Sequence, residues 1–172
     1  MAKAKEGVRE KVISDSPERY FLKYAYPCSF VLVEQAMISE QERKELEKKL
    51  LENKPIGRNE LEKIFPAAFK RIKKLAKEMK KDAWDLAVIR EYFFGEKHND
   101  FIDKSDGMYA VFGPTFKELC KVHKAEIIAK KDNVLAVKYG PVERNVFATL
   151  VPDAKKGDKV TVHLAFAIEK IN

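Results

Sequence analysis

The side chains of this chain best suited to thiol or soft-metal chemistry are two cysteines and three histidines. Thiolate and imidazole are ligands for zinc, iron and copper, and a thiol beside an imidazole can also act as a nucleophile. The five residues, Cys28, Cys120, His98, His123 and His163, occur singly, with no CxxC or HxxxH spacing. No structural zinc site is therefore predicted.

The two cysteines allow more than one interpretation. Cys28 follows an aromatic segment and is expected to be buried, and it can approach Cys120 if the two domains dock. A reducing cytosol keeps thiols free, so we expect no disulfide between them. An enzyme in which either cysteine works with a histidine is a third hypothesis for this protein. Because the chain has no nucleophile elbow, phosphate loop or dinucleotide fingerprint, we predict no catalytic residue and a protein that is not an enzyme.

A dense run of basic residues offers a different chemistry, the binding of phosphates. It comprises Lys70, Arg71, Lys73, Lys74, Lys77, Lys80 and Lys81, and the whole chain carries a net charge of +7. At helical spacing these side chains form a broad face opposite an apolar stripe, and such a face can contact a nucleic acid or an acidic protein. The alternative is the solvated side of a lysine-rich helix, because no aromatic residues alternate with the lysines to stack on bases.

The first half of the chain is predicted to be helical. Ser16 followed by Pro17 is typical of an N-cap with a proline at the first helical position, and Pro27 is expected to end this helix. Ser29 is then the expected cap of a second helix. The β-branched residues that follow make a strand the alternative for this segment. Residues 1–15 are expected to form a flexible N-terminus.

Further helix starts carry capping signals. Ser39 and Glu42 form a capping box, Asn59 is the next expected cap, and Pro66 is expected to begin the basic helix. A more apolar helix is predicted from Ala83 to Phe94. We therefore expect four to six helices.

The pattern changes after residue 95. Glu96 to Pro114 is rich in Asp, Asn, Gly and Lys and is predicted to be a linker or long loop. Beyond it, short β-branched runs alternate with turn residues such as Gly140 and Gly157. Four or five strands in about 50 residues predict a small closed barrel, because an open sheet would leave long unpaired edges. We assign residues 16–114 to a helical domain and residues 115–172 to a barrel domain.

The strand region carries an ordered set of motifs. They are Tyr139-Gly140, Leu150-Val151-Pro152, Gly157-Asp158, Val162-His163 and Phe166-Ala167-Ile168-Glu169-Lys170. In this order and spacing, the segment from Leu119 to Ile171 resembles the body of the HypC/HupF hydrogenase-maturation chaperones. The preceding residues have no counterpart that we recognise in that family.

The resemblance implies a five-stranded, OB-like β-barrel that acts as a carrier and scaffold. Members of the family bind the maturation protein HypD and the hydrogenase large-subunit precursor, and they help to assemble iron that carries cyanide and carbon monoxide. In an ungapped comparison Cys120 falls on the functional cysteine of the family. His163 matches the family's histidine in the last strand. A role for Cys120 as a soft thiolate ligand for transient iron is thereby implied.

This chain departs from the family pattern around the cysteine. Cys120 is internal, and Lys124-Ala125 stands where the family has Pro-Gly. The departure favours a diverged relative that keeps the fold and a protein partner. In that case Cys120 is a half-buried strand cysteine and His163 is a barrel-face histidine bonded to a backbone carbonyl.

These features together predict an α+β protein with a helical N-terminal domain and a small barrel. The leading functional hypothesis is a hydrogenase-maturation or metallocentre-assembly chaperone, or a diverged relative acting as a protein-binding scaffold, with no cofactor besides transient iron. The alternative is a nucleic-acid-binding protein that uses the Lys70 to Lys81 face and the OB-like barrel. The chain shows neither a secretory signal nor a long apolar run, so we expect a cytoplasmic protein without a membrane partner. Its Lys- and Glu-rich composition is typical of thermophiles.

Overall fold

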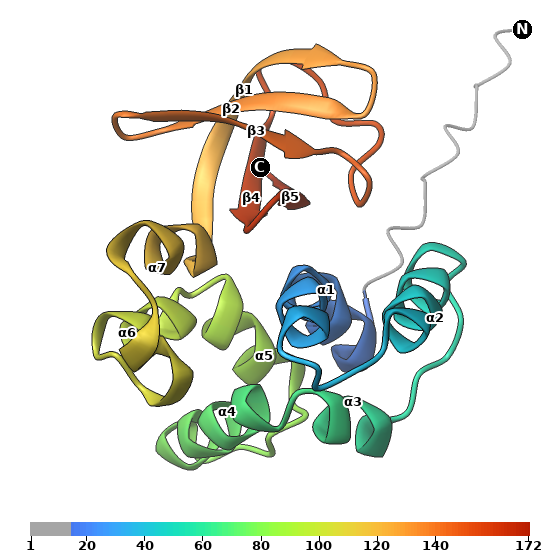
Figure 1. The fold of residues 1–172 in the computed structure, drawn as a ribbon, viewed down its shortest axis with the longest axis vertical. Helices are drawn as coiled ribbons and strands as arrows, with labels where there is room; N and C mark the ends of the chain where they lie inside the picture. Colours follow the sequence, from blue (N-terminus) through green and yellow to red (C-terminus); the bar gives the residue numbers. More distant parts are fainter. Residues whose placement is uncertain (1–14) are drawn as a thin grey trace, which may run out of the picture.

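The computed structural model describes residues 15–172. In this range seven α-helices and one 3-10 helix precede a closed barrel of five strands, which confirms the predicted α+β class. Figure 1 shows the helices gathered on one side and the barrel on the other. The expected flexible N-terminus falls almost entirely on residues 1–14, which lie outside the described residues. None of the described helices combines the length and apolar character needed to cross a membrane.

Helix α1 (Pro17–Glu34) is a single long helix, so the predictions that Pro27 ends it and that Ser29 caps another helix were wrong. A proline inside a helix removes one backbone hydrogen bond and costs about 3 kcal/mol. Tyr20, Phe21 and Tyr24 of the same helix are almost fully buried, and this burial outweighs the cost. The Ser29 hydroxyl donates to the Tyr26 carbonyl one turn earlier, inside the helix.

The helices that follow begin largely where their caps predicted. They are α2 (Glu40–Leu51), α3 (Arg58–Ile64), α4 (Pro66–Met79) and α5 (Leu86–Phe93). The capping box of Ser39 and Glu42 is present, and Pro66 occupies the first position of α4. The cap of α3 is Gly57 and not Asn59. Helix α5 begins later than predicted because Asp85 accepts the Ala87 amide proton and caps it.

The prediction of a linker between residues 96 and 114 was wrong. This segment contains α6 (Lys97–Asp103) and the 3-10 helix η1 (Gly107–Val111), and α7 (Pro114–Cys120) follows at once. Its polar residues have structural roles, since the Asn99 amide donates to the Val122 carbonyl and accepts the Val122 amide proton. Because helices continue to Cys120, the first strand begins only at His123.

The barrel closes in the order β1-β2-β3-β5-β4. Its strands are β1 (His123–Lys131), β2 (Val134–Tyr139), β3 (Val142–Phe147), β4 (Lys159–His163) and β5 (Phe166–Ile171). Every neighbouring pair is antiparallel except β3 and β5, which meet at Phe147 and Phe166 alone. Gly140 has a φ of 52° in the two-residue turn between β2 and β3, a conformation that favours glycine.

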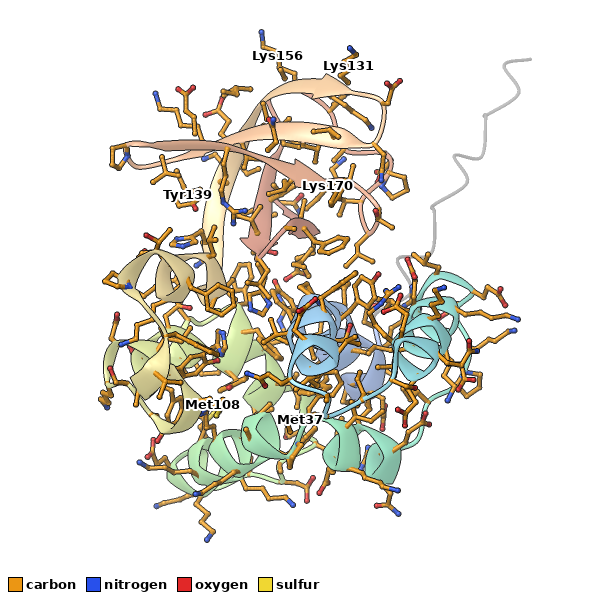
Figure 2. All side chains as sticks on the ribbon, viewed as in Figure 1. Met37, Met108, Lys131, Tyr139, Lys156 and Lys170 are labelled. Carbon is orange, nitrogen blue, oxygen red and sulfur yellow. The ribbon has the colours of Figure 1, made fainter. Side chains whose placement is uncertain are left out.

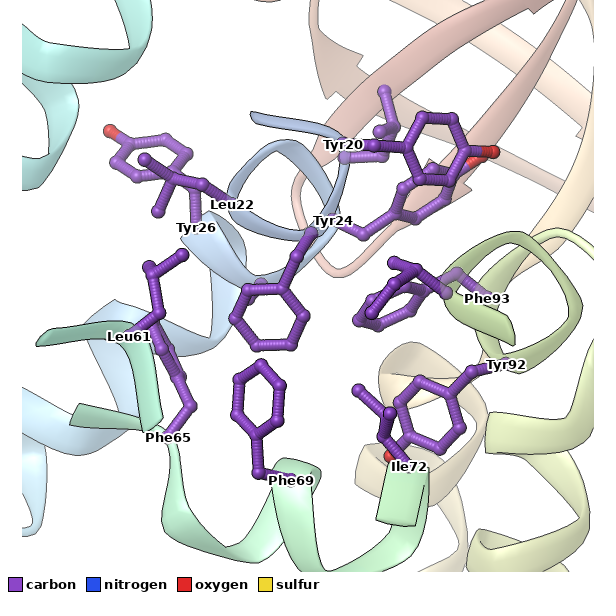
Figure 3. Packing of buried hydrophobic residues seen from close by; sticks show 14 of the residues in the cluster. Tyr20, Leu22, Tyr24, Tyr26, Leu61, Phe65, Phe69, Ile72, Tyr92 and Phe93 are labelled. Carbon is purple, nitrogen blue, oxygen red and sulfur yellow. The ribbon is translucent and has the colours of Figure 1, made fainter. Parts of the chain in front are cut away.

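Two hydrophobic cores hold these elements. One fills the barrel interior, and the other is an aromatic core around α1. Figure 3 shows Tyr24 of α1 near Phe93 of α5, with Phe69 of α4 below them. The aromatic core also contains Val122, Phe166 and Ile168 from the barrel segment, so the helices and the outer face of the barrel share it.

A polar cluster reinforces the contact between α1 and the barrel. The hydroxyls of Tyr20 and Tyr24 each donate to Glu169 Oε1 at 2.6 Å, and Tyr24 also bonds Thr161 at 2.9 Å. Burial and the nearby Glu169 carboxylate raise the pKa of both tyrosines. Both phenols therefore stay protonated as donors, which fixes α1 against β4 and β5.

Candidate thiol–imidazole site

Cys28 and His163 meet where α1 crosses the end of β4. The Cys28 Sγ atom lies 3.8 Å from His163 Nε2, although the two residues are 135 positions apart. Cys28 comes from α1, and His163 is the last residue of β4, so its expected place in the last strand was wrong. The structure thus places the thiol of Cys28 beside the histidine that the family comparison singled out.

Hydrogen bonding determines how His163 presents its ring. Its Nδ1 atom lies 2.7 Å from the Tyr24 carbonyl, which can only accept, so Nδ1 carries the proton. The neutral ring then turns the lone pair of Nε2 toward Cys28. Burial deprives the charged imidazolium form of hydration and so disfavours it, which lowers the pKa of His163 to about 4.

The paired thiol is also uncharged at neutral pH. Burial raises the pKa of Cys28 to about 12, and the nearby Cys120 adds to this rise. A thiol S–H is a weak donor, and its only imidazole partner here is His163 Nε2. The resting pair is therefore a neutral thiol and a neutral imidazole. The sulfur can become a metal ligand only when the thiol loses its proton.

Cys120 is the last residue of α7, so its expected place in a barrel strand was wrong. It is buried, and burial raises the pKa of its thiol to about 12. Cys120 and Cys28 line the same cavity, and both are free cysteines. Cys28 was expected to be buried and is half-buried. Cys120 is thus close to the site without being the cysteine that contacts His163.

The shared cavity has a volume of about 150 Å³ and a mostly apolar wall. Phe65, Phe112 and Leu164 contribute to the wall. Met37 and Met108, labelled in Figure 2, also line it and are 55% and 52% exposed. A mostly apolar pocket of this size accommodates a small uncharged ligand.

His98 connects this cavity to α6 and α7. Its Nε2 donates to the Cys120 carbonyl at 2.9 Å, and its Nδ1 accepts from the Tyr92 hydroxyl at 3.2 Å. Its ring centre lies 5.2 Å from that of His163 in an edge-to-face arrangement. Burial lowers the pKa of His98 to about 3, so two neutral imidazoles lie together inside the protein. No feature of the sequence around His98 pointed to this role.

The third histidine lies elsewhere. His123 stacks on Tyr139 with ring centres 4.1 Å apart and donates to the Glu118 carbonyl at 2.9 Å. It does not line the cavity.

The basic residues of α4 and of the two positions after it occupy two environments. Lys70, Lys73, Lys74, Lys77, Lys80 and Lys81 are exposed. Arg71 is buried, donates to Asp106 at 2.8 Å and lies 4.7 Å from the Tyr109 ring centre. It therefore supports the cavity wall and contributes nothing to the exposed basic face.

Among residues 15–172 no three His, Cys, Asp or Glu side chains are grouped to hold a metal ion. Cys28 and His163 provide a thiol and an imidazole, two ligand types that iron accepts. An ion held there would need its remaining ligands from elsewhere, which suits a temporary cargo better than a structural metal.

The segment that forms the barrel matches a known protein family. Residues 123–172 match the model of the HupF/HypC family, which confirms the resemblance for this C-terminal segment. The match covers all five strands and includes His163, but it begins after Cys120. No curated protein matches the chain.

Proposed function

We propose that this protein is a metallocentre-assembly chaperone of the hydrogenase-maturation type, or a diverged relative that keeps the role of protein-binding scaffold. The observation that carries the proposal is the contact between Cys28 of α1 and His163 of the barrel, whose sequence matches the HupF/HypC family. A cysteine and a histidine are the two ligand types implied by the family resemblance. Here the cysteine beside the histidine is Cys28 of helix α1. It takes the ligand role that the resemblance implies for Cys120.

The chemistry of the pair suits an iron cargo that arrives with other ligands attached. The Cys28 thiol must release its proton to solvent before the sulfur can bind, because metal ligation requires the thiolate. His163 already presents the Nε2 lone pair, and its bond to Tyr24 fixes the ring. The mostly apolar pocket beside the sulfur offers small uncharged ligands an apolar wall.

The partners that this proposal implies are HypD and a hydrogenase large-subunit precursor, in the cytoplasm, with the chain acting as a binding protein and not as an enzyme. The full-length protein should therefore capture both partners when it is co-produced with them. The captured material should contain iron bound through Cys28 and His163. Cys28→Ser and His163→Ala are expected to lower the iron content by roughly tenfold or more. Iron analysis of the eluted complexes provides the measurement.

Cys120→Ser is the matched control for this experiment, since Cys120 lines the same cavity without contacting His163. It should change the iron content little and leave capture of both partners intact. Failure of the wild-type protein to enrich either partner would reject the maturation role. Equal loss of iron in both cysteine variants would reject the assignment of Cys28 as the ligand.

A second candidate function is nucleic-acid binding along α4. Lys70, Lys74, Lys77 and Lys80 are exposed and form no ion pair within residues 15–172. Lys73 and Lys81 instead contact Glu62 and Asp85. A free row of lysines on one helix is the arrangement that favours phosphate contacts.

Titration of single-stranded and duplex oligonucleotides at two salt concentrations tests this candidate. Binding through α4 should weaken steeply as salt rises, because phosphate contacts release counterions. Lys74→Gln with Lys77→Gln should reduce the slope of log K against log salt by about 2, one for each lysine. No binding at low salt would remove the candidate, and Lys131→Gln on the barrel is the control.

A further inference from the structure

The barrel has one incompletely paired seam, at β3. This strand forms six residue pairs with β2 but only the Phe147–Phe166 pair with β5. The Phe147 amide donates to the Ala165 carbonyl at 2.8 Å, so it points away from β2. Backbone groups alternate along a strand, so those of Glu143 and Asn145 point the same way and meet no strand within residues 15–172. Figure 1 shows the β2–β3 hairpin projecting beyond the rest of the barrel.

An apolar groove lies directly beside this free edge. Its walls include Pro27 and Phe30 of α1, Leu119, Asn145 and Phe147, and Leu164 to Phe166 of the β4–β5 turn. The groove has a volume of about 430 Å³. Phe30 and Phe147 are 39% and 46% exposed, so two aromatic side chains present apolar surface where the edge ends. A large side chain inserted here would cover surface that otherwise faces water.

A guanidinium nitrogen in the same groove has no acceptor. Arg144 donates through Nε to the Tyr139 hydroxyl at 2.9 Å and through Nη1 to the Leu164 carbonyl. These two bonds hold the side chain in place. Its Nη2 atom is buried and has no hydrogen-bond partner within residues 15–172. A donor on a charged group is costly to leave unpaired, so turning the guanidinium toward an oxygen of a docked segment would be favourable.

We infer that the β3 edge is a docking site for an extended segment of a partner protein, which adds as a strand alongside Glu143 and Asn145. The segment places a large apolar side chain in the groove and an Asp or Glu carboxylate on Arg144 Nη2. A carboxylate fits better than a neutral oxygen, because a bond between two charged groups is about twice as strong as a neutral one. Main-chain bonds supply affinity and the two side chains supply specificity, as in other cases of strand addition.

This inference rests on the proposed scaffold function, for which it names a surface and the chemistry of the partner. It uses a different part of the protein from the thiol–imidazole pair. Strand addition at β3 and cargo binding at Cys28 can therefore be tested separately.

The test uses a random linear peptide library displayed on phage, selected on the full-length protein. Peptides that combine an extended apolar segment with an Asp or Glu should be enriched. The affinity of an enriched peptide, measured by fluorescence anisotropy, should fall by roughly tenfold or more in Arg144→Met, which removes the charged donor. It should fall by a similar factor in Asn145→Pro, which removes one edge amide proton.

Asn145→Ala is the matched control, because it removes the side chain and keeps the amide proton. Because the Asn145 side chain also lines the groove, the decisive quantity is the further loss of peptide affinity in Asn145→Pro relative to Asn145→Ala. Proline is tolerated at an edge position whose N–H lies outside the ladder, and circular dichroism confirms that each variant is folded. Two variants with different defects keep the test decisive if one of them fails to fold.

Three results would overturn the inference. The first is that no peptide is enriched. The second is that Arg144→Met and Asn145→Pro bind the peptide as tightly as the wild type does. The third is that the protein is a dimer in light scattering, that Asn145→Pro makes it monomeric, and that peptides do not compete with the dimer. Because the peptide assay contains neither HypD nor the large-subunit precursor, its failure leaves the capture experiment valid. Conversely, edge-dependent peptide binding without capture of either partner would support the docking site and reject the maturation role.

Discussion

Acidification from pH 6 to pH 4 is expected to lower the free energy of unfolding by about 4–5 kcal/mol through His98 and His163 together. Burial lowers the pKa of His98 from 6.5 to about 3 and that of His163 from 6.5 to about 4. Below pH 6.5 the unfolded chain therefore binds protons that the folded protein rejects. The stabilisation is complete above pH 6.5 and is lost as the pH falls toward the folded values, at up to about 1.4 kcal/mol per pH unit for each histidine.

Urea denaturation at a series of pH values measures this loss. His163→Gln should remove about half of the histidine contribution to the pH dependence, because the Gln amide can still donate to the Tyr24 carbonyl but does not titrate. Cys120→Ser is the control, since it alters the same cavity without removing an imidazole. Carboxylates in ion pairs, such as Asp106 with Arg71, destabilise in the same direction, so the comparison between variants is the decisive quantity. Equal pH dependence in the wild type and His163→Gln would contradict the assignment.

Phe21→Ala should destabilise the protein by about 3–5 kcal/mol, the range expected for a fully buried phenylalanine. Phe21 is 0% exposed, and its ring centre lies between 4.6 and 6.0 Å from those of four other aromatic residues. They are Phe65, Phe69, Trp84 and Phe93. Removing the ring leaves a cavity at the centre of this cluster, which the neighbouring rings cannot fill without leaving their own contacts.

The same variant tests whether the helices and the barrel unfold together. Trp84 is the single tryptophan and reports on the helical part, whereas circular dichroism reports on both parts. Because Val122, Phe166 and Ile168 belong to the aromatic core, we expect one coincident transition that shifts as a whole. Leu51→Ala, at a site 49% exposed, is the control and should change stability by less than about 0.5 kcal/mol. Two separate transitions, or a loss below about 1 kcal/mol in Phe21→Ala, would count against the shared core.

Several features were determined by the sequence alone, and each depends on only a few neighbouring residues. The capping box of Ser39 and Glu42 closes within one helical turn, and Pro66 is compatible with only the first turn of a helix. The Gly140 turn and the β-branched runs predicted the barrel strands, and the ordered motifs predicted the match of residues 123–172 to the HupF/HypC family. Local bonding and backbone sterics decide these features, so sequence patterns reveal them.

Only the tertiary structure decided the features that depend on distant contacts. Pro27 remains inside a helix because aromatic burial outweighs its local cost, and the polar segment after residue 95 is helical because His98 and Asn99 bond to residues 120 and 122. The contact between Cys28 and His163 spans 135 residues, and the burial of Arg71 depends on Asp106 from another element. Such pairings follow from how whole elements pack, and neither the helical nor the strand period carries information about them.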